Sequence, residues 1–171
     1  MPKCSAPAAW HSGVCLPRSA AHPAPAMQLN RFTDFGLRVM MYLTQCRDRT
    51  VPVTIPEIAA RFEISRNHLV KVVHFLSQQG WIVATRGKGG GLRLARDAVE
   101  YRIGELVRVL EDQGALVNCA QPPCVLNGAC RLSGALAESL QAFYRTLDGY
   151  TLDDLVRAPT ALAIVRLHRA A

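Results

Sequence analysis

The chain has 171 residues, 50% of them hydrophobic, which is enough for one globular domain with a dimerisation arm. Its 20 Lys and Arg against 13 Asp and Glu give a formal net charge of +7, which favours a polyanionic partner but is shared by unrelated basic proteins. No apolar stretch approaches the roughly 20 residues of a membrane-spanning helix, so we expect a soluble, cytoplasmic protein with no membrane partner.

Residues 1–26 differ from the rest of the chain in composition. They are rich in Ala and Pro, contain no acidic residue and lack the apolar core of roughly 7 to 15 residues that a secretory signal carries. A compact amphipathic pattern begins only at Met27, so we interpret 1–26 as a disordered extension or as the product of a mis-assigned start. Cys4 and Cys15 lie in this segment and have no predicted role.

A first helix is predicted directly after Met27. Apolar side chains recur there at helical spacing, namely Phe32, Phe35, Val39, Met40 and Leu43. They predict a helix that ends near Gln45 and is capped by Asn30 or Thr33.

Two further helices with a short turn between them are predicted after a polar link. Thr54 and Glu57 have the spacing of a capping box, which predicts a short helix to about Phe62. Ser65 is placed to cap the next helix, and Gly80, which tolerates the left-handed conformation, is placed to end it. The apolar stripe of this helix consists of Leu69, Val72, Val73 and Leu76. Two helices this close together are typical of a helix-turn-helix motif.

A β-hairpin is predicted after the second of these helices. Residues 81–85 and 92–94 have the pattern of strands, and the glycine-rich residues 87–91 have the pattern of the turn between them. The glycine run lacks both the spacing of a phosphate-binding P-loop and a helix directly behind it, so a hairpin tip is favoured. The sequence therefore predicts a wing beside the helix-turn-helix motif.

The segment from 65 to 96 contains no carboxylate and six basic residues, which are Arg66, Lys71, Arg86, Lys88, Arg93 and Arg96. A solvated basic face is the alternative to a DNA-binding surface. The predicted DNA contacts are Ser65, Arg66, Asn67, His68, Lys71, Arg86 and Lys88. Of these, we expect Arg66, Asn67 and His68 to approach base edges, and the other residues to contact phosphate or the minor groove.

The second half of the chain predicts a helix from Ile103 to about Asp112 and, after a cysteine-containing segment, a long amphipathic helix. The apolar seam of the long helix consists of Leu132, Leu136, Leu140, Phe143 and Leu147. This seam favours a dimer, although packing on the first helix of the same chain is the alternative. A short helix is expected from Leu152 to Val156.

The predicted fold is therefore mainly α with a small β-hairpin wing: a winged helix-turn-helix plus a long dimerisation helix. The expected divisions are the extension 1–26, a winged helix-turn-helix DNA-binding domain 27–100, a cluster-binding loop and dimerisation helix 101–156, and a tail 157–171 with no predicted element.

Cys119, Cys124 and Cys130 lie four and five residues apart in a segment whose prolines and glycine exclude a regular helix. A chain without an export signal keeps its thiols reduced, so clustered thiols suggest a metal. Zinc usually takes four ligands, often as cysteine pairs two residues apart, whereas iron-sulfur clusters accept more varied spacings and a ligand other than cysteine. The spacing favours an iron-sulfur cluster, with zinc and redox-active or buried thiols as alternatives. Cys46 is predicted to be a small core residue.

Several stretches together resemble a family of winged-helix iron-sulfur transcription regulators, and within it the nitric-oxide-sensing repressors. The matching stretches are 27–29 with 32–38, 65–71, 86–88 with 90–91, 116–119 with Cys124 and 129–132, and 150–156. They occur in the same order as in the family and cover almost all of 27–156. Regulators of iron-sulfur supply in this family carry a histidine ligand three residues after the third cysteine, where this chain has Ser133.

The resemblance implies a nitric-oxide-sensitive repressor, not an enzyme, that binds an inverted-repeat operator in double-stranded DNA as a homodimer. It implies an iron-sulfur cluster, more typically 4Fe-4S than 2Fe-2S, held by Cys119, Cys124 and Cys130. Asp34 matches the family's fourth ligand, which reaches across from the partner subunit. As an alternative, Asp34 caps its own helix. The alternative functions are an iron-sulfur-supply regulator and a zinc-stabilised DNA-binding protein without sensing.

Overall fold

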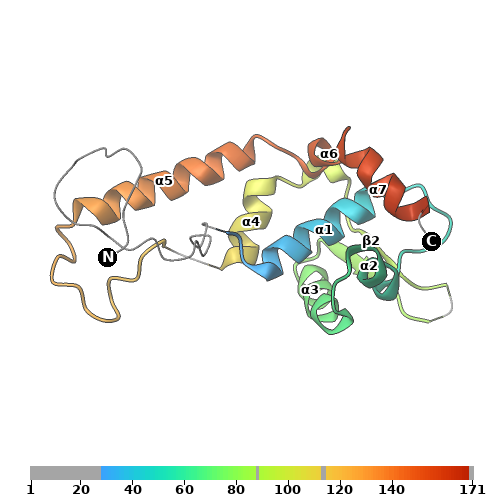
Figure 1. The fold of residues 1–171 in the computed structure, drawn as a ribbon, viewed down its shortest axis with the longest axis horizontal. Coiled ribbons are helices and arrows are strands. Elements are labelled where there is room, and N and C mark those ends of the chain that lie inside the picture. The colour runs from blue at the N-terminus through green and yellow to red at the C-terminus, as the bar shows by residue number, and fades with distance from the viewer. Residues whose placement is uncertain (1–27, 88, 113–114, 170–171) are drawn as a thin grey trace, which may run out of the picture.

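The computed structural model describes residues 28–87, 89–112 and 115–169. The elements in chain order are α1 (Arg31–Gln45), α2 (Ile55–Phe62), α3 (Arg66–Gln78), β1 (Ile82–Ala84), β2 (Leu92–Leu94), the 3-10 turn η1 (Ala98–Glu100), α4 (Ile103–Glu111), α5 (Arg131–Asp148), α6 (Leu152–Leu155) and α7 (Thr160–Arg169). Figure 1 shows a helical body at one side and α5 extending away from it. The fold is mainly helical with one antiparallel hairpin, which confirms the predicted fold class. None of the described helices has the length and apolarity needed to span a bilayer.

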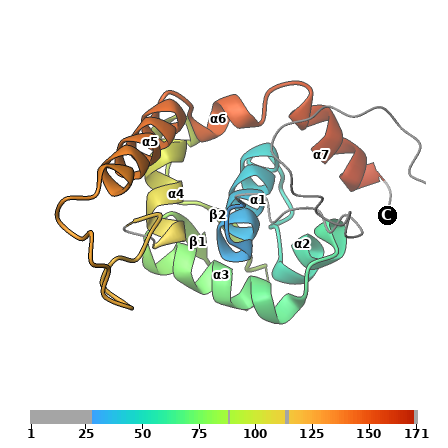
Figure 2. The same cartoon turned by 60° about the vertical axis from the view of Figure 1, so that its left-hand side comes forward.

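Helix α1 is the centre of the body and contacts α3, α4, α6 and α7 (Figure 2). Asn30 is its N-cap, since the side chain of Asn30 accepts a hydrogen bond from the backbone N–H of Thr33 at 2.8 Å. Thr33 and Asp34 are therefore helical residues and not caps. Val39, Met40 and Tyr42 have no exposed surface, because α1 is covered on several sides.

The helix-turn-helix pair forms as predicted from its local signals. The side chain of Thr54 accepts from the backbone N–H of Glu57 at 3.3 Å, and α2 ends at Phe62. Glu63 follows with a φ of 53°, which turns the chain toward α3. Ser65 occupies the N-cap position of α3, but its side chain makes no capping hydrogen bond, so that part of the prediction is wrong. Gly80 closes α3 with a φ of 69°, as expected.

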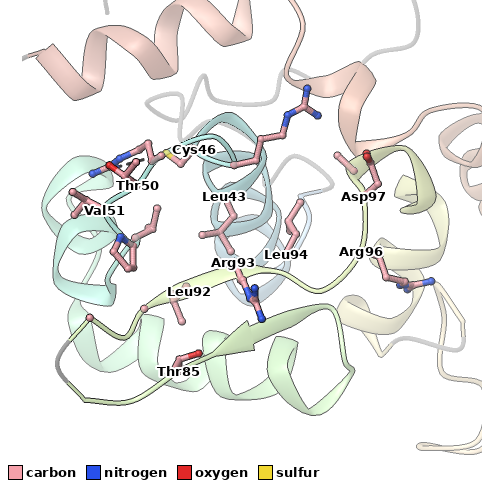
Figure 3. Close-up of a pocket in the computed structure, with 17 residues that line it drawn as sticks. Leu43, Cys46, Thr50, Val51, Thr85, Leu92, Arg93, Leu94, Arg96 and Asp97 are labelled. Carbon is pink, nitrogen blue, oxygen red and sulfur yellow. Dashed lines mark hydrogen bonds between the residues drawn. The ribbon is translucent and has the colours of Figure 1, made fainter.

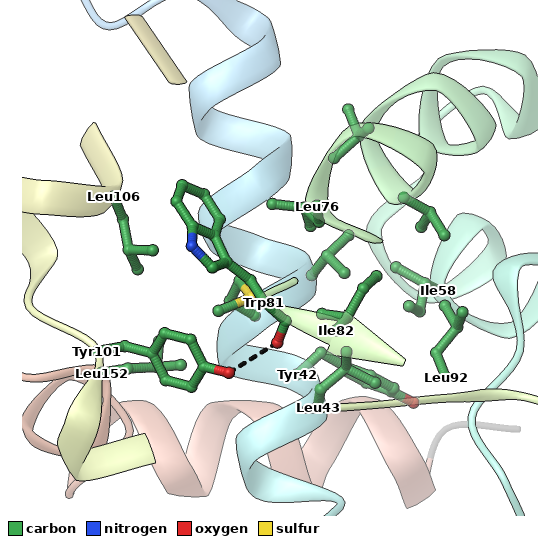
Figure 4. Close-up of a cluster of buried hydrophobic side chains, with 14 of the residues drawn as sticks. Tyr42, Leu43, Ile58, Leu76, Trp81, Ile82, Leu92, Tyr101, Leu106 and Leu152 are labelled. Carbon is green, nitrogen blue, oxygen red and sulfur yellow. Dashed lines mark hydrogen bonds between the residues drawn. The ribbon is translucent and has the colours of Figure 1, made fainter. Parts of the chain in front are cut away.

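The wing is a short antiparallel hairpin in which Ile82 pairs with Leu94 and Ala84 with Leu92. Gly87 and Gly89 adopt positive φ angles at the tip, where a residue with a side chain is strained. The base of the hairpin is held by the Tyr101 hydroxyl, which donates to the carbonyl oxygen of Trp81 at 2.8 Å (Figure 4). This hydrogen bond connects the wing to the hydrophobic core, to which both Tyr101 and Trp81 belong.

Helix α5 packs chiefly on α4, through its C-terminal half. Tyr144 is the buried residue of α5, whereas Leu132 in its first turn is 65% exposed. The beginning of α5 and the segment before it lie at the end of the molecule remote from the body (Figure 1). The amphipathic seam predicted for this helix is thus only partly covered by the described part of the chain.

Two short helices complete the described chain. Thr151 and Asp154 form a capping box at α6, close to the predicted short helix. Helix α7 lies in the tail for which the sequence predicted no element, and its Ile164 is buried. Because α7 packs on α1, this helix belongs to the body.

Candidate DNA interface and metal centre

The exposed face of α3 lies opposite the face that packs in the core. The core-facing side chains are Leu69, Val72, Val73 and Leu76. At about 100° per residue, the opposite face consists of the exposed residues Asn67, Val70, Lys71, His74 and Gln78. The structure therefore directs the predicted DNA contacts Asn67 and Lys71 away from the body.

A groove of about 630 Å³ lies between α3 and the wing. Its lining includes Arg66, Val70, His74 and Ser77 from α3, and Thr85, Arg86, Gly87 and Gly90 from the wing. The groove brings together two residues predicted from separate motifs, Arg66 and Arg86. Lys88, the other predicted contact of the wing, lies outside the described residues.

Ser65 and His68 are exposed at the edges of this surface. The ring of His68 lies against Phe35 of α1, with the ring centroids 6.3 Å apart. Sequence reasoning named His68 but missed Val70 and His74, which share the outward face with Asn67. Both residues can be identified by their angle around the helix axis, because they lie on the side of α3 opposite the buried stripe that includes Leu69. This assignment requires knowing which face of α3 packs in the core.

The basic side chains of α3 and the wing, unlike several elsewhere in the molecule, form no salt bridge with an acidic side chain among the described residues. Away from it, Arg38 pairs with Asp34 at 2.8 Å and Arg108 pairs with Asp148. Among the described residues, no salt bridge involves a position between 65 and 96. The positive charge of α3 and the wing is therefore not neutralised by the residues that the structure describes, which favours an external polyanion.

A second hollow, of about 690 Å³, lies on the other side of the wing, between β2 and the link after α1 (Figure 3). Cys46 lies in its wall and is 5% exposed, which confirms the prediction that it is a core residue. Burial raises the pKa of the Cys46 thiol above its ordinary value. Arg49 in the same wall donates to Glu57 at 2.5 Å, so this charged group is already paired.

The three predicted metal ligands lie on the irregular segment between α4 and α5. The backbone N–H of Cys124 donates to the carbonyl oxygen of Cys119 at 3.0 Å, which closes a turn between these two residues. The side chain of Asn118 accepts from the backbone of Ala120 and Gln121 at 3.0 and 3.2 Å, which orders the start of that turn. Cys124 is exposed, and Cys119 is half-buried.

Cys130 differs from the other two cysteines because it is the N-cap residue of α5. The nearby backbone N–H groups of Ser133 and Leu132 lower the pKa of the Cys130 thiol, although its side chain makes no capping hydrogen bond. A helix N-terminus stabilises a thiolate through these N–H groups and the helix dipole. Cys130 is thus favoured in the form that binds a metal.

The described residues include no group of three Cys, His, Asp or Glu side chains arranged to hold a metal. Asp34 is in the first turn of α1, where it forms its salt bridge with Arg38. Helix α1 lies in the body, whereas the cysteine segment lies beyond the far end of α5 (Figure 1). One chain by itself therefore does not bring Asp34 to the three thiols.

The chemistry of the thiols nevertheless fits an iron-sulfur cluster. Three thiols lie on one segment at unequal spacing, and this segment, residues 115–130, contains no histidine. Cys130 has a lowered pKa, and none of the three cysteines is buried. These properties match thiolate ligation of a cluster better than the paired cysteines of structural zinc sites.

A helix-turn-helix pair with an unneutralised basic wing defines a winged-helix DNA-binding protein. Residues 29–158 match the Rrf2 family, described as iron-dependent transcriptional regulators, and the chain belongs to this family. The protein is accordingly a DNA-binding transcription regulator.

Solved structures share the fold of this chain. The chain is 25% identical to CymR (YrzC), the global cysteine regulator of B. subtilis, with a TM-score of 0.62, and the match covers 75% of this chain and 95% of CymR. It is 22% identical to IscR of T. potens, with a TM-score of 0.60, and that match covers 77% and 88% of the two chains. The latter likeness shows the fold alone.

Proposed function

We propose that this protein is a homodimeric repressor whose DNA binding depends on an iron-sulfur cluster, and that nitric oxide releases it from DNA. The observation that carries the proposal is the position of the three thiols. They lie directly before α5, and Cys130 is the N-cap of that helix. Whatever binds these thiols therefore acts on the helix that joins the cysteine segment to the body.

The dimer is supported by the apolar surface that α5 leaves uncovered. Leu132 is 65% exposed and Phe143 is 36% exposed on the predicted seam. A mainly apolar hollow of about 190 Å³ lies beside the seam and is lined in part by Leu29, Leu116 and Phe143. A second copy of α5 covers such a surface at little cost, since both copies present the same apolar side chains.

In the proposed dimer, each α3 reads one half-site of an inverted repeat. The two recognition helices then lie about 34 Å apart, the spacing of successive major grooves. Asn67 and Arg66 contact base edges, while Lys71, Arg86 and Lys88 contact phosphates. Ser65 leaves its hydroxyl exposed and without a capping bond, which suits a phosphate contact.

The cluster ligands we propose are Cys119, Cys124 and Cys130, with Asp34 from the partner subunit as the fourth. The cluster, when bound, supplies iron that reacts with nitric oxide. With the cluster bound, the three thiolates would tie the segment 119–130 together, and Cys130, as the N-cap of α5, would transfer this constraint to the helix. Loss of the constraint changes the setting of α5 and therefore the distance between the two α3 helices.

Contacts within the body support this route from α5 to the DNA-binding surface. Arg108 of α4 forms a two-pronged hydrogen bond with Asp148 near the end of α5. At the C-terminal end of α4, Glu111 accepts from the backbone N–H of Asn30 at 2.8 Å. Asn30 caps α1, which packs on α3. A change in α5 is thus connected to the recognition helix through packed helices.

The experiment compares the full chain with Cys124→Ala, both purified without oxygen. We expect wild-type protein to be brown, to contain iron and sulfide, and to release a selected operator duplex when nitric oxide bleaches its visible absorption. Cys124→Ala should stay folded and dimeric but show no nitric-oxide-dependent release. Cys46→Ala, which removes a thiol outside the segment, is the matched control and should respond like wild type.

The proposal fails if the oxygen-free wild type is colourless and poor in iron yet binds the duplex fully. Zinc in place of iron, with no response to nitric oxide, would favour the zinc-stabilised alternative. A regulator of iron-sulfur supply is the second candidate, favoured by the match of residues 29–158 to a family described as iron-dependent transcriptional regulators. It predicts DNA binding that follows cluster loading but not low concentrations of nitric oxide.

A further inference from the structure

Val70 is an apolar side chain in the middle of the outward face of the recognition helix. It is 46% exposed, whereas its neighbours Leu69 and Val72 are 0% and 1% exposed. It lies one helical turn from Arg66 on one side and one turn from His74 on the other. Val70 is therefore surrounded on α3 by polar groups and takes no part in closing the core.

Packing within the body gives no reason for a valine at position 70. A β-branched residue lowers helix propensity, and an exposed one gains little from burial in return. In the described structure Val70 lines the groove between α3 and the wing, on the same wall as Arg66 and His74. An apolar group at this place meets the duplex when α3 enters the major groove.

The major groove presents one apolar group, the 5-methyl group of thymine. The other features at base edges are hydrogen-bond donors and acceptors, which a valine cannot pair. Burying the methyl group against Val70 removes apolar surface from water on both sides. Arg66 and His74 lie one helical turn to either side of Val70, so their polar side chains can bind neighbouring groups of the duplex and keep Val70 opposite one base pair.

We propose that Val70 determines sequence specificity by contacting the 5-methyl group of one thymine in each half-site. The inference rests on the proposed function only in requiring that α3 reads the major groove. It does not depend on the iron-sulfur cluster or on nitric oxide. It assigns a thymine to the part of the operator that faces the middle of α3.

The test replaces each thymine of the operator by uracil, which removes only the methyl group. A duplex is first selected from a random library with the full-length, oxygen-free protein, and affinities are then measured by fluorescence anisotropy. Loss of one buried methyl group should weaken wild-type binding about fourfold at one thymine per half-site. Substitution in both half-sites should weaken it about 16-fold.

Val70→Ala should bind the thymine duplex less tightly and be indifferent to uracil at that position. Alanine favours the helix, so this variant is expected to fold, which circular dichroism checks. Val109→Ala is the matched control, because Val109 is a 41% exposed valine on α4. It should keep the wild-type ratio between thymine and uracil duplexes.

Two results overturn the inference about Val70. One is a selected half-site in which no thymine can be replaced by uracil with loss of affinity. The other is an equal loss for wild type and Val70→Ala at every such thymine. A protein that binds selected and random duplexes alike contradicts sequence reading by α3 itself. Normal specificity without a response to nitric oxide contradicts the proposed sensing alone.

Discussion

The body of the molecule and its arm, residues 115–136, differ in how far they bury their apolar side chains. In the body, Met40, Leu69 and Leu76 have no exposed surface. In the arm, Val125 is 98% exposed and Leu132 is 65% exposed. The body thus completes a core among the described residues, whereas the arm leaves apolar side chains exposed there. In the proposed mechanism, regulation acts on the arm, which carries the three thiols.

The largest effect is expected from truncating the core of the body. Leu76→Ala should lower the free energy of unfolding by about 2–5 kcal/mol, because it leaves a cavity in a close-packed region. Leu132→Ala in the arm should change the unfolding of the body by less than about 0.5 kcal/mol but weaken the dimer. Urea denaturation and sedimentation measure the two effects. Equal losses of stability would show that the arm is part of the same cooperative core.

The next effect concerns the DNA surface of the body. Asn67→Ala should cost about 1–3 kcal/mol on the selected duplex and little on a random one, because a base contact is lost. Lys71→Ala should weaken both duplexes alike and flatten the dependence of affinity on salt. Titrations at several salt concentrations distinguish the two variants. Identical profiles would contradict the division into base and phosphate contacts.

The contact between α4 and α5, which connects the body to the arm, is tested at Gly104 of α4. A Cβ at this position would overlap the Asp148 carboxylate and lie 2.7 Å from the Tyr144 carbonyl oxygen, so Gly104→Ala forces α5 away from α4. We expect a loss of about 1–3 kcal/mol from overpacking, together with an altered response to nitric oxide.

Gly134→Ala is the matched control for this substitution, because nothing lies within 4 Å of a Cβ there. It should stabilise α5 by about 0.5–1 kcal/mol through helix propensity. Thermal unfolding measures both variants. Similar destabilisation by the two substitutions would contradict the close α4–α5 approach as the cause.

The smallest expected effect is a pH dependence of stability that arises from the ion pair between Arg108 of α4 and Asp148 of α5. The hydrogen bonds from Arg108 hold the pKa of Asp148 below its ordinary value of 3.8. The stabilisation is therefore fully present above pH 3.8 and is lost as the pH falls through the lowered pKa of the folded state. Asp148→Asn should lower Tm slightly at pH 7 and not at more acidic pH. A difference in Tm that stays constant down to acid would contradict this ion pair as its source.

Local patterns of the sequence determined most of the body. Asn30, the Thr54–Glu57 pair and Gly80 act through backbone groups within a few residues, so the bounds of α1, α2 and α3 follow from nearby residues. The hairpin follows in the same way from its strand pattern and glycine-rich tip. The three clustered cysteines were likewise visible in the sequence, since their spacing needs no tertiary information.

Only the tertiary structure decided which side chains share a surface. It placed Val70 and His74 beside the wing and His68 against Phe35, because the direction of each depends on which stripe of α3 packs in the core. It separated Asp34 from the cysteine segment, and it packed α7 onto α1. These outcomes depend on contacts between residues far apart in the chain, and periodicity along the sequence carries no information about such contacts.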